Sequence, residues 1–353
     1  MKHTFRYLIG VLAIAIPMSL NAQEEKIDRT PKLSGFVQGL YQLNAKDGIV
    51  KNNTFQARRV RMSIEGNLAK NLTYKIQGDF VRKPMLVDVF VKYKVCDEFA
   101  IQAGQFKTPF TLESPINPVN LEIFDYGESV QKLCGYSDVC GVGSIGRDLG
   151  IMATGKLFKV EDKGFSLVNY SIGVFNGNGA NEKDNNNRKD FVGRLEVHPM
   201  LKDLTLSGSI YRGFYDIDGG IHNGTRNRWS AGAQYSDGDL MVRAEYLNGT
   251  TGYNSVNLEG DVVEQYWDSK GYYAVAGYNF LLGKDHSQKL MPVLRYEYFT
   301  KDSAVIDGGT SYYTVGLNYW PVKSLNFKLD YSLIQADGGD NSHRVVGILS
   351  YKF

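Results

Sequence analysis

The chain has 353 residues, of which 12% are aromatic, with 38 glycines and nine prolines. Its 40 basic and 38 acidic side chains nearly balance, which excludes the strongly basic field that a nucleic-acid partner requires. Many aromatic residues and glycines with few prolines are typical of long strands joined by turn-rich loops.

The first 22 residues have the pattern of a secretory signal peptide. Lys2 and Arg6 precede an apolar run over residues 7–20, and a short polar segment ends at Ala22. We expect cleavage after Ala22. The run is too short to cross a membrane comfortably as a helix, although a permanent N-terminal anchor is the alternative.

From Leu33 onward the sequence repeats one pattern. Runs of about 8 to 12 residues alternate apolar and polar side chains, as in "LTYKIQGDF", and each run ends in a turn or loop. No segment has a convincing helical period. We predict about sixteen strands, at residues 33–43, 54–66, 72–81, 86–95, 99–106, 148–158, 165–175, 190–198, 203–214, 227–235, 239–249, 271–281, 290–299, 311–320, 324–334 and 344–353.

The connections between these strands alternate in length. Short turns such as "GNLAKN", "CDE" and "PVKS" occupy every second place, and longer polar loops occupy most of the others. The longest connection covers residues 107–147, and another long loop is predicted at residues 248–270. This alternation is typical of an up-and-down meander whose two ends face different compartments.

A soluble sandwich also alternates apolar and polar faces. An even strand count, an export signal and loops of unequal length on two sides together favour lipid around a polar lumen. In lipid a sheet can have no free edge, and about sixteen strands leave a water-filled channel. We therefore predict an all-β, transmembrane antiparallel barrel, a single domain over residues 23–353, in the outer membrane of a Gram-negative bacterium.

The terminal segment "RVVGILSYKF" fits this barrel, because the last strand can pair with the first near Leu33. Tyr351 and Phe353 are expected in the aromatic girdle at the membrane interface. They also resemble the assembly signal of bacterial outer-membrane proteins. Val346 and Ile348 are apolar at positions where a polar lumen predicts polar side chains.

Several segments form an ordered set over nearly the whole mature chain: "FQARRVRMSIEGNLAKNLTYKIQGDF", "IQAGQFKTPFTLES", "GRDLGIMATGKL", "NYSIGVFNGNG", "FVGRLEVHP", "PVLRYEYF", "TVGLNYWP" and "SYKF". Together they resemble the phosphate-selective porin O and P family in the form common in Bacteroidetes-type bacteria. The resemblance implies a sixteen-stranded outer-membrane porin, usually a homotrimer, that passes small solutes, with phosphate or other anions as candidates. It also suggests that the loop at 107–147 folds into the pore.

The strand phases predict which charged side chains face the lumen, where they would control ion passage. The basic set is Arg59, Arg61, Lys75, Lys92, Lys94, Lys156, Arg194, Arg243, Arg295 and Lys328, with Lys107 at the base of the long loop. The acidic set is Glu65, Asp79, Asp88, Asp148, Glu196, Glu245, Glu297 and Asp330. The alternative is that these charges pair with one another and only keep the wall polar and rigid, and "VRAEY" and "VLRYEY" fit it.

The long loop itself is acidic. Between residues 108 and 146 the sequence contains one lysine, Lys132, and five acids, which are Glu113, Glu122, Asp125, Glu128 and Asp138. A fixed negative ring repels anions, which argues against strict phosphate selectivity.

The chain has three cysteines. Cys134 and Cys140 lie in "CGYSDVC", where an exported protein could form a local disulfide or keep free thiols. Cys96 stands alone, and the spacing does not match a metal site.

Two other functions compete with that of a porin. A barrel hydrolase needs a serine beside a histidine base, but the mature histidines fall in turns, loops or a strand end, at His198, His222, His286 and His343. We therefore expect neither an enzyme nor a cofactor. A barrel that serves as an adhesin or scaffold without conductance is the remaining alternative.

Overall fold

The computed structural model describes residues 27–46, 48–199, 201–216, 224–256, 261–284, 286–306 and 308–353. The predicted signal peptide lies outside these ranges. None of the described helices is long and apolar enough to cross a membrane.

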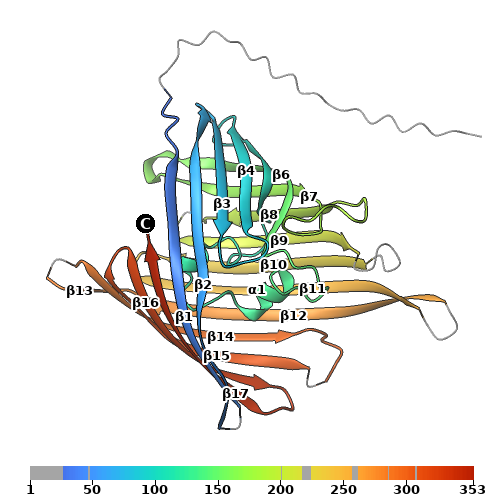
Figure 1. Ribbon diagram of the computed structural model, residues 1–353. Helices are drawn as coiled ribbons and strands as arrows, with labels where there is room; N and C mark the ends of the chain where they lie inside the picture. The colour runs from blue at the N-terminus through green and yellow to red at the C-terminus, as the bar shows by residue number, and fades with distance from the viewer. Residues whose placement is uncertain are drawn as a thin grey trace, which may run out of the picture.

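The described residues form one closed antiparallel sheet with three short helical segments (Figure 1). The elements in chain order are β1 (Lys32–Lys46), β2 (Ile49–Ala69), β3 (Leu72–Asp79), β4 (Leu86–Lys94), β5 (Ala100–Lys107), η1 (Pro118–Asn120), α1 (Glu128–Leu133), β6 (Arg147–Val160), η2 (Glu161–Lys163), β7 (Phe165–Phe175), β8 (Asp190–Val197), β9 (Leu204–Tyr215), β10 (Gly224–Ser236), β11 (Leu240–Val256), β12 (Val262–Tyr278), β13 (Phe280–Leu282), β14 (Gln288–Thr300), β15 (Gly309–Val322), β16 (Leu325–Ala336) and β17 (Asn341–Lys352).

The ring has sixteen positions in the described part of the chain, as predicted. β12 and β13 both pair with β14, so the two segments together fill one position. Every other strand pairs with its neighbours in the sequence, and β17 closes the ring against β1. This is the up-and-down topology that the alternation of turns and loops predicted.

The terminal phenylalanine takes part in this closure. The backbone N–H of Gly35 donates to the carbonyl of Phe353 at 2.9 Å, and the N–H of Phe353 donates to Gly35 at 3.0 Å. A Cβ at Gly35 would stand 2.5 Å from the backbone oxygen of Arg61 and 2.6 Å from the Phe353 ring, so the position requires glycine. Pairing of the last strand with the first is therefore confirmed.

The predicted long loop at residues 248–270 is wrong. β11 continues to Val256 and β12 starts at Val262, and Figure 1 shows this hairpin extending far beyond its neighbours. Cross-strand contacts support the extension, since the rings of Tyr253 and Trp267 lie 4.7 Å apart. Glycine, asparagine and threonine gave this segment the composition of a loop, although its backbone remains paired.

The outer surface of the barrel is apolar. Leu294 on β14 is 63% exposed and Leu329 on β16 is 58% exposed, both between inward residues that are buried. Aromatic pairs on adjacent strands follow the end with the longer loops, including Trp229 with Tyr246 at 5.3 Å. An apolar band with aromatic residues at its boundary is the surface that lipid requires.

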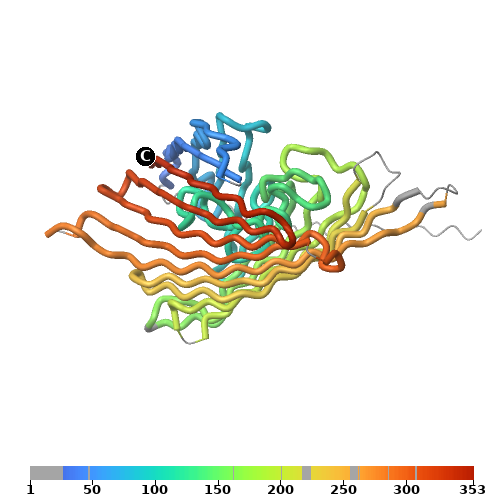
Figure 2. The backbone as a smooth tube through the Cα atoms, turned by 90° about the horizontal axis from the view of Figure 1, so that it is seen from below, coloured from blue at the N-terminus to red at the C-terminus, as the bar shows by residue number. Residues whose placement is uncertain are grey.

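The connection between β5 and β6, residues 108–146, folds into the barrel, where Figure 2 shows it in green within the ring of strands. We call it the inner loop. It contains the short helix α1, which sequence reasoning missed because six residues carry no helical period. Phe110, Leu121 and Leu133 of the inner loop are buried against inward apolar side chains of the wall. This side of the lumen is therefore packed like a protein core.

A second apolar cluster explains the two residues that broke the alternation of β17. Val346 and Ile348 pack with Leu40 of β1 around Phe124 of the inner loop. Their side chains face the lumen as the strand phase requires, but they meet the inner loop instead of water. Apolar inward residues thus mark where the inner loop docks.

Candidate functional site

Acidic residues of the inner loop form ion pairs with arginines of the wall. The carboxylate of Glu113 is fully buried and lies 2.5 Å from Nη1 of Arg295 and 3.4 Å from Nη2 of Arg243. Glu122 also contacts Arg243, at 2.7 Å. Two strands on one side of the barrel, β11 and β14, therefore hold this part of the inner loop.

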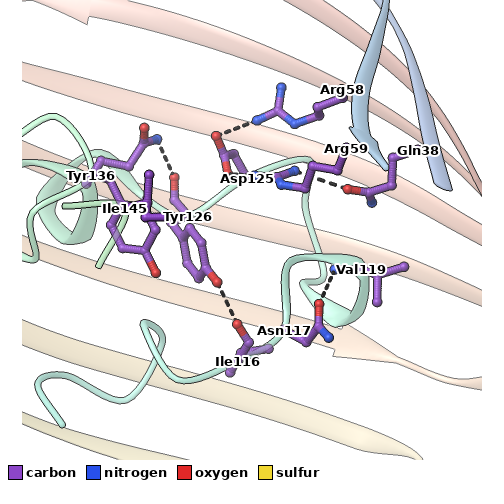
Figure 3. A network of polar contacts seen from close by, with 12 residues as sticks. Gln38, Arg58, Arg59, Ile116, Asn117, Val119, Asp125, Tyr126, Tyr136 and Ile145 are labelled. Atoms are coloured by element: carbon purple, nitrogen blue, oxygen red, sulfur yellow. Dashed lines mark hydrogen bonds and ion pairs between the residues drawn. The ribbon is translucent and has the colours of Figure 1, made fainter. Parts of the chain in front are cut away.

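Asp125 attaches the inner loop to the opposite side. Figure 3 shows its carboxylate between Arg58 and Arg59 of β2, with Arg59 Nη2 at 2.9 Å from Asp125 Oδ1. Arg59 also donates to Gln38 at 3.1 Å. Burial alone would raise the pKa of Asp125, but Arg58 and Arg59 outweigh this effect and lower the pKa below its ordinary value of 3.8. The carboxylate is thus held in its charged form.

Asp138 makes the third attachment. Its two carboxylate oxygens each accept a hydrogen bond from the guanidinium of Arg228 on β10, both at 2.6 Å. Arg228 also donates to the carbonyl of Leu133 at 2.6 Å. Burial opposes the charged form of Asp138, yet Arg228 lowers the pKa of the carboxyl below its ordinary value. The remaining acid, Glu128, pairs within the inner loop with Lys132 at 3.5 Å.

These contacts correct the expectation of a negative ring. The inner loop is acidic, but the described structure pairs four of its five acids with wall arginines and the fifth with its own lysine. A paired carboxylate has little remaining field to repel an anion. The composition of the inner loop therefore reports how it docks and does not argue against anion passage.

The disulfide between Cys134 and Cys140 is not formed, and both are buried free thiols in the structure. The Cys140 thiol donates to Oδ1 of Asp138 at 2.9 Å, and the Cys134 thiol contacts the Thr111 hydroxyl at 3.8 Å. The two side chains therefore have separate partners. Cys96 is an exposed free thiol in the turn between β4 and β5.

The predicted inward charges are paired in large part. The acid and base partners within 4.0 Å are Arg61 with Asp79, Lys75 with Glu65, Lys94 with Asp97, Arg194 with Glu196, Arg295 with Glu297, and Asp88 with Arg147. Asp148 accepts backbone N–H groups of Leu149 and Gly177. Lys328 donates to the Leu121 carbonyl and lies buried two residues from Asp330. For these residues the structure agrees with the alternative that the charges pair with one another and keep the wall polar and rigid.

The "VRAEY" segment does not pair as the alternative predicted. Arg243 reaches the inner loop, whereas Glu245 accepts from the Leu112 N–H at 2.9 Å and from the Tyr273 hydroxyl at 3.0 Å. Both residues of this motif therefore bind the inner loop or its immediate support. The "VLRYEY" pair does form, at 3.4 Å.

Lys107, which the sequence predicted to line the pore, contacts the inner loop in the structure. Its ammonium donates to the carbonyls of Ser114 at 2.6 Å and Ile116 at 2.7 Å, and to the Tyr126 hydroxyl at 2.8 Å. All three acceptors belong to the inner loop. The side chain is thus directed into the inner loop that begins one residue later.

The end of the barrel that carries the short turns has several hollows, among them the following two. One has a volume of about 370 Å³ and is lined by Lys92, Lys94, Lys156 and Glu196. The other, of about 280 Å³, lies beside Lys352. In the described residues neither Lys92 nor Lys156 has a carboxylate within 4.0 Å. These lysines are the predicted inward cations that stay available to a solute.

Sequence reasoning missed several inward arginines. A bulge in β2 opposite Gln38 and Gly39 turns both Arg58 and Arg59 inward, which strict alternation cannot do. Further members of this set are Arg82, Arg226, Arg228 and Arg344. The two-residue spacing of Arg226 and Arg228 in "TRNRWS" was a readable signal, because it places both on one face.

The closed sixteen-position barrel, its apolar outer band and its charged interior around a docked loop define an outer-membrane porin. The chain belongs to the phosphate-selective porin O and P family, whose pattern it matches over residues 32–216, more than half of its length. No curated protein matches the sequence. Both the family and the fold are those of a channel.

Solved structures show the same fold. An anion-selective porin from Comamonas acidovorans aligns over 92% of this chain and 100% of its own, with a TM-score of 0.65 and 14% identity. The outer membrane channel DcaP of Acinetobacter baumannii aligns over 92% and 97%, with a TM-score of 0.62 and 14% identity. The trimer form of OmpT from Vibrio cholerae aligns over 92% and 99%, with a TM-score of 0.60 and 12% identity. At these identities the likeness establishes the fold.

Proposed function

We propose that this porin lets small hydrophilic solutes diffuse passively and prefers anions, including phosphate, over cations. The observation that carries the proposal is an excess of arginine beside the inner loop. Six arginines gather there with Asp79, Asp88 and Asp125, and one of the arginines, Arg344, also faces Glu128 and Glu297, so that the arginines outnumber these acids by one. The arginines are Arg58, Arg59, Arg61, Arg82, Arg147 and Arg344.

The hydrogen-bonding capacity of this arginine cluster is not used up by the protein. The Nε–H groups of Arg58, Arg59 and Arg344 are buried without a partner in the described structure. The Phe124 ring lies between two of these guanidiniums, at 5.3 Å from Arg58 and 4.4 Å from Arg344. Because these Nε–H groups are buried, the cluster acts on a solute through its positive field, which attracts phosphate and carboxylate anions.

The free lysines at the short-turn end extend this field. Lys92 and Lys156 lie in the same hollow, so their charges add at the periplasmic mouth of the channel. Asp97 and Glu196 line the same hollow, so its three lysines leave a net positive charge of one, and a positive cleft concentrates anions. Anion selectivity is a property of the Comamonas porin itself, and it supports the same preference for a barrel of this fold.

Two alternatives predict different behaviour. An adhesin or scaffold would leave a membrane without conductance. A hydrolase would need a serine–histidine contact, whereas the described ring nitrogens of His198 and His343 contact Asn169, Leu204, Thr205 and Tyr331. The docking of the inner loop on charged walls favours a selective channel over both.

We also propose that the protein assembles as a homotrimer after removal of residues 1–22. β3, β4 and β5 have only 8, 9 and 8 residues. At a tilt of about 45° eight residues cover roughly 19 Å, less than the apolar band of about 25 Å. The turn above β3 exposes Phe80 and Met85. A second copy of the barrel can bury the exposed apolar side chains above these short strands, which lie beyond the reach of the lipid.

The test is conductance of the purified porin in a planar bilayer with a KCl gradient. We expect discrete channels whose reversal potential has the sign of anion preference. If phosphate binds in the arginine cluster, added phosphate should reduce the chloride current through these channels. A cation-preferring channel would reject the anion assignment, and a silent membrane would favour the scaffold. Mass measurement of the mature protein and its oligomer tests cleavage and trimer formation separately.

A further inference from the structure

Lys107 lies at the base of the inner loop. It is the last residue of β5, and it pairs in register with Arg147, the first residue of β6, so two cations stand at the neck of the inner loop. Arg147 is neutralised by Asp88 at 2.7 Å. Lys107 has no carboxylate within 4.0 Å in the described structure, and its partners are neutral oxygens.

The three oxygens satisfy the three N–H groups of the ammonium. They come from Ser114, Ile116 and Tyr126, so one side chain joins segments ten residues apart within the inner loop. The Tyr126 hydroxyl also donates to the Ile116 carbonyl at 2.6 Å, and Figure 3 shows this bond beside the Asp125 contact. Hydrogen bonds from a charged donor are about twice as strong as neutral ones.

The contacts of Tyr126 carry this arrangement further into the inner loop. Its ring packs against that of Tyr136 with centroids 4.5 Å apart and a tilt of 35° between the ring planes, and the Tyr136 hydroxyl lies 3.3 Å from the hydroxyl oxygen of Ser114. The amide of Gln131 donates to the Tyr126 carbonyl at 2.7 Å. Tyr126 follows Asp125 directly in the chain, so any shift of Tyr126 moves the carboxylate that pairs with Arg58 and Arg59.

We propose that Lys107 is a positioning residue that holds the inner loop in its docked state and thereby places Asp125 over the arginine cluster. In this role its effect on the position of the inner loop outweighs the field of its own charge, which its neutral partners do not cancel. The inference rests on the proposed anion channel for its conductance readout. It differs from a pore-lining role in the sign of its effect on selectivity.

The variant Lys107→Met tests this sign. If Lys107 lined the pore, removing its charge would reduce anion preference. If it holds the inner loop, the inner loop loosens, Asp125 leaves Arg58 and Arg59, and conductance and anion preference both rise. Lys92→Met is the matched control, because it removes a free lumen lysine that makes no inner-loop contact, and it should lower anion preference at unchanged conductance.

A second readout does not depend on conductance. Cys134 and Cys140 are buried in the inner loop, and burial raises the pKa of both thiols, that of Cys140 to about 11. Maleimide should therefore label them slowly in the wild type and at least about tenfold faster in Lys107→Met, since losing one charge-assisted hydrogen bond can change an opening equilibrium by that factor. The exposed Cys96 serves as the internal reference.

The outcomes separate the two claims. Unchanged labelling of Cys134 and Cys140 together with a fall in anion preference like that of Lys92→Met would overturn the positioning role. Lys107→Arg keeps a charged donor and should restore slow labelling, which a general folding defect would not. If Lys107→Met does not fold, Tyr126→Phe removes one acceptor and should accelerate labelling in the same direction; no acceleration there would also refute the proposal. A silent wild type would reject the channel while labelling still decides the role of Lys107.

Discussion

The ion pair between Glu113 and Arg295 should contribute strongly to stability, because both side chains are almost fully buried. Their exposed fractions are 0% and 2%, and the closest atoms lie 2.5 Å apart. Charge centres about 4 Å apart interact by about 4 kcal/mol at an effective dielectric constant of about 20. We therefore expect a coupling free energy of about 2 to 4 kcal/mol between the two residues.

A double-mutant cycle measures this coupling. Glu113→Gln, Arg295→Met and the double variant are unfolded in urea in phospholipid vesicles, with tryptophan fluorescence as the signal. The matched control is Glu65 with Lys75, a pair of similar length at 2.6 Å whose side chains are 47% and 26% exposed. Solvent screening should limit the control to below about 1 kcal/mol. A coupling for Glu113 and Arg295 no larger than the control would refute the claim that buried ion pairs dock the inner loop.

Three further outcomes follow from the same geometry. Arg344→Gln should shift the reversal potential toward cation preference, because it removes a surplus positive charge. The double variant Lys92→Gln with Lys156→Gln should shift it in the same direction by removing charge at the periplasmic mouth. An unshifted potential in both would show that these cations have only a structural role in the barrel wall. Because the pKa of Asp125 is lowered below 3.8, its contact contributes stability above that pH and is lost as pH falls through the lowered value, so the contribution of this contact to the free energy of unfolding in urea should stay constant from pH 8 to about 5 and fall only below about pH 4. Phe80→Ser should weaken the trimer in detergent without changing the fold, and an intact trimer would place the interface elsewhere.

The strands could be predicted because their side chains meet a different environment on each face of the sheet. Lipid outside and a polar interior force a period of two along every strand, so Leu325–Ala336 was found within two residues of its ends. The same rule failed at residues 248–270, where the hairpin leaves the membrane and no lipid imposes an apolar face. Hydrogen bonds between β11 and β12 continue there with loop-like side chains.

The interior was harder to predict, because its contacts join distant parts of the chain. Glu113 and Arg295 are 182 residues apart, and no local pattern connects them. The bulge that turns Arg58 inward is a backbone feature without a signature in "FQARRVRM". Val346 and Ile348 did carry a signal, since inward apolar residues in a wet barrel require an apolar partner, which Phe124 of the inner loop supplies.

The central claim is that surplus arginine beside the docked inner loop, with its acids neutralised, makes the channel prefer anions. The zero-current potential of the wild-type porin in a KCl gradient tests it most directly. We predict the sign of chloride permeation over potassium. A potential of zero or of the opposite sign would contradict the account, because it would mean that the arginine cluster does not face the path of the permeating ions.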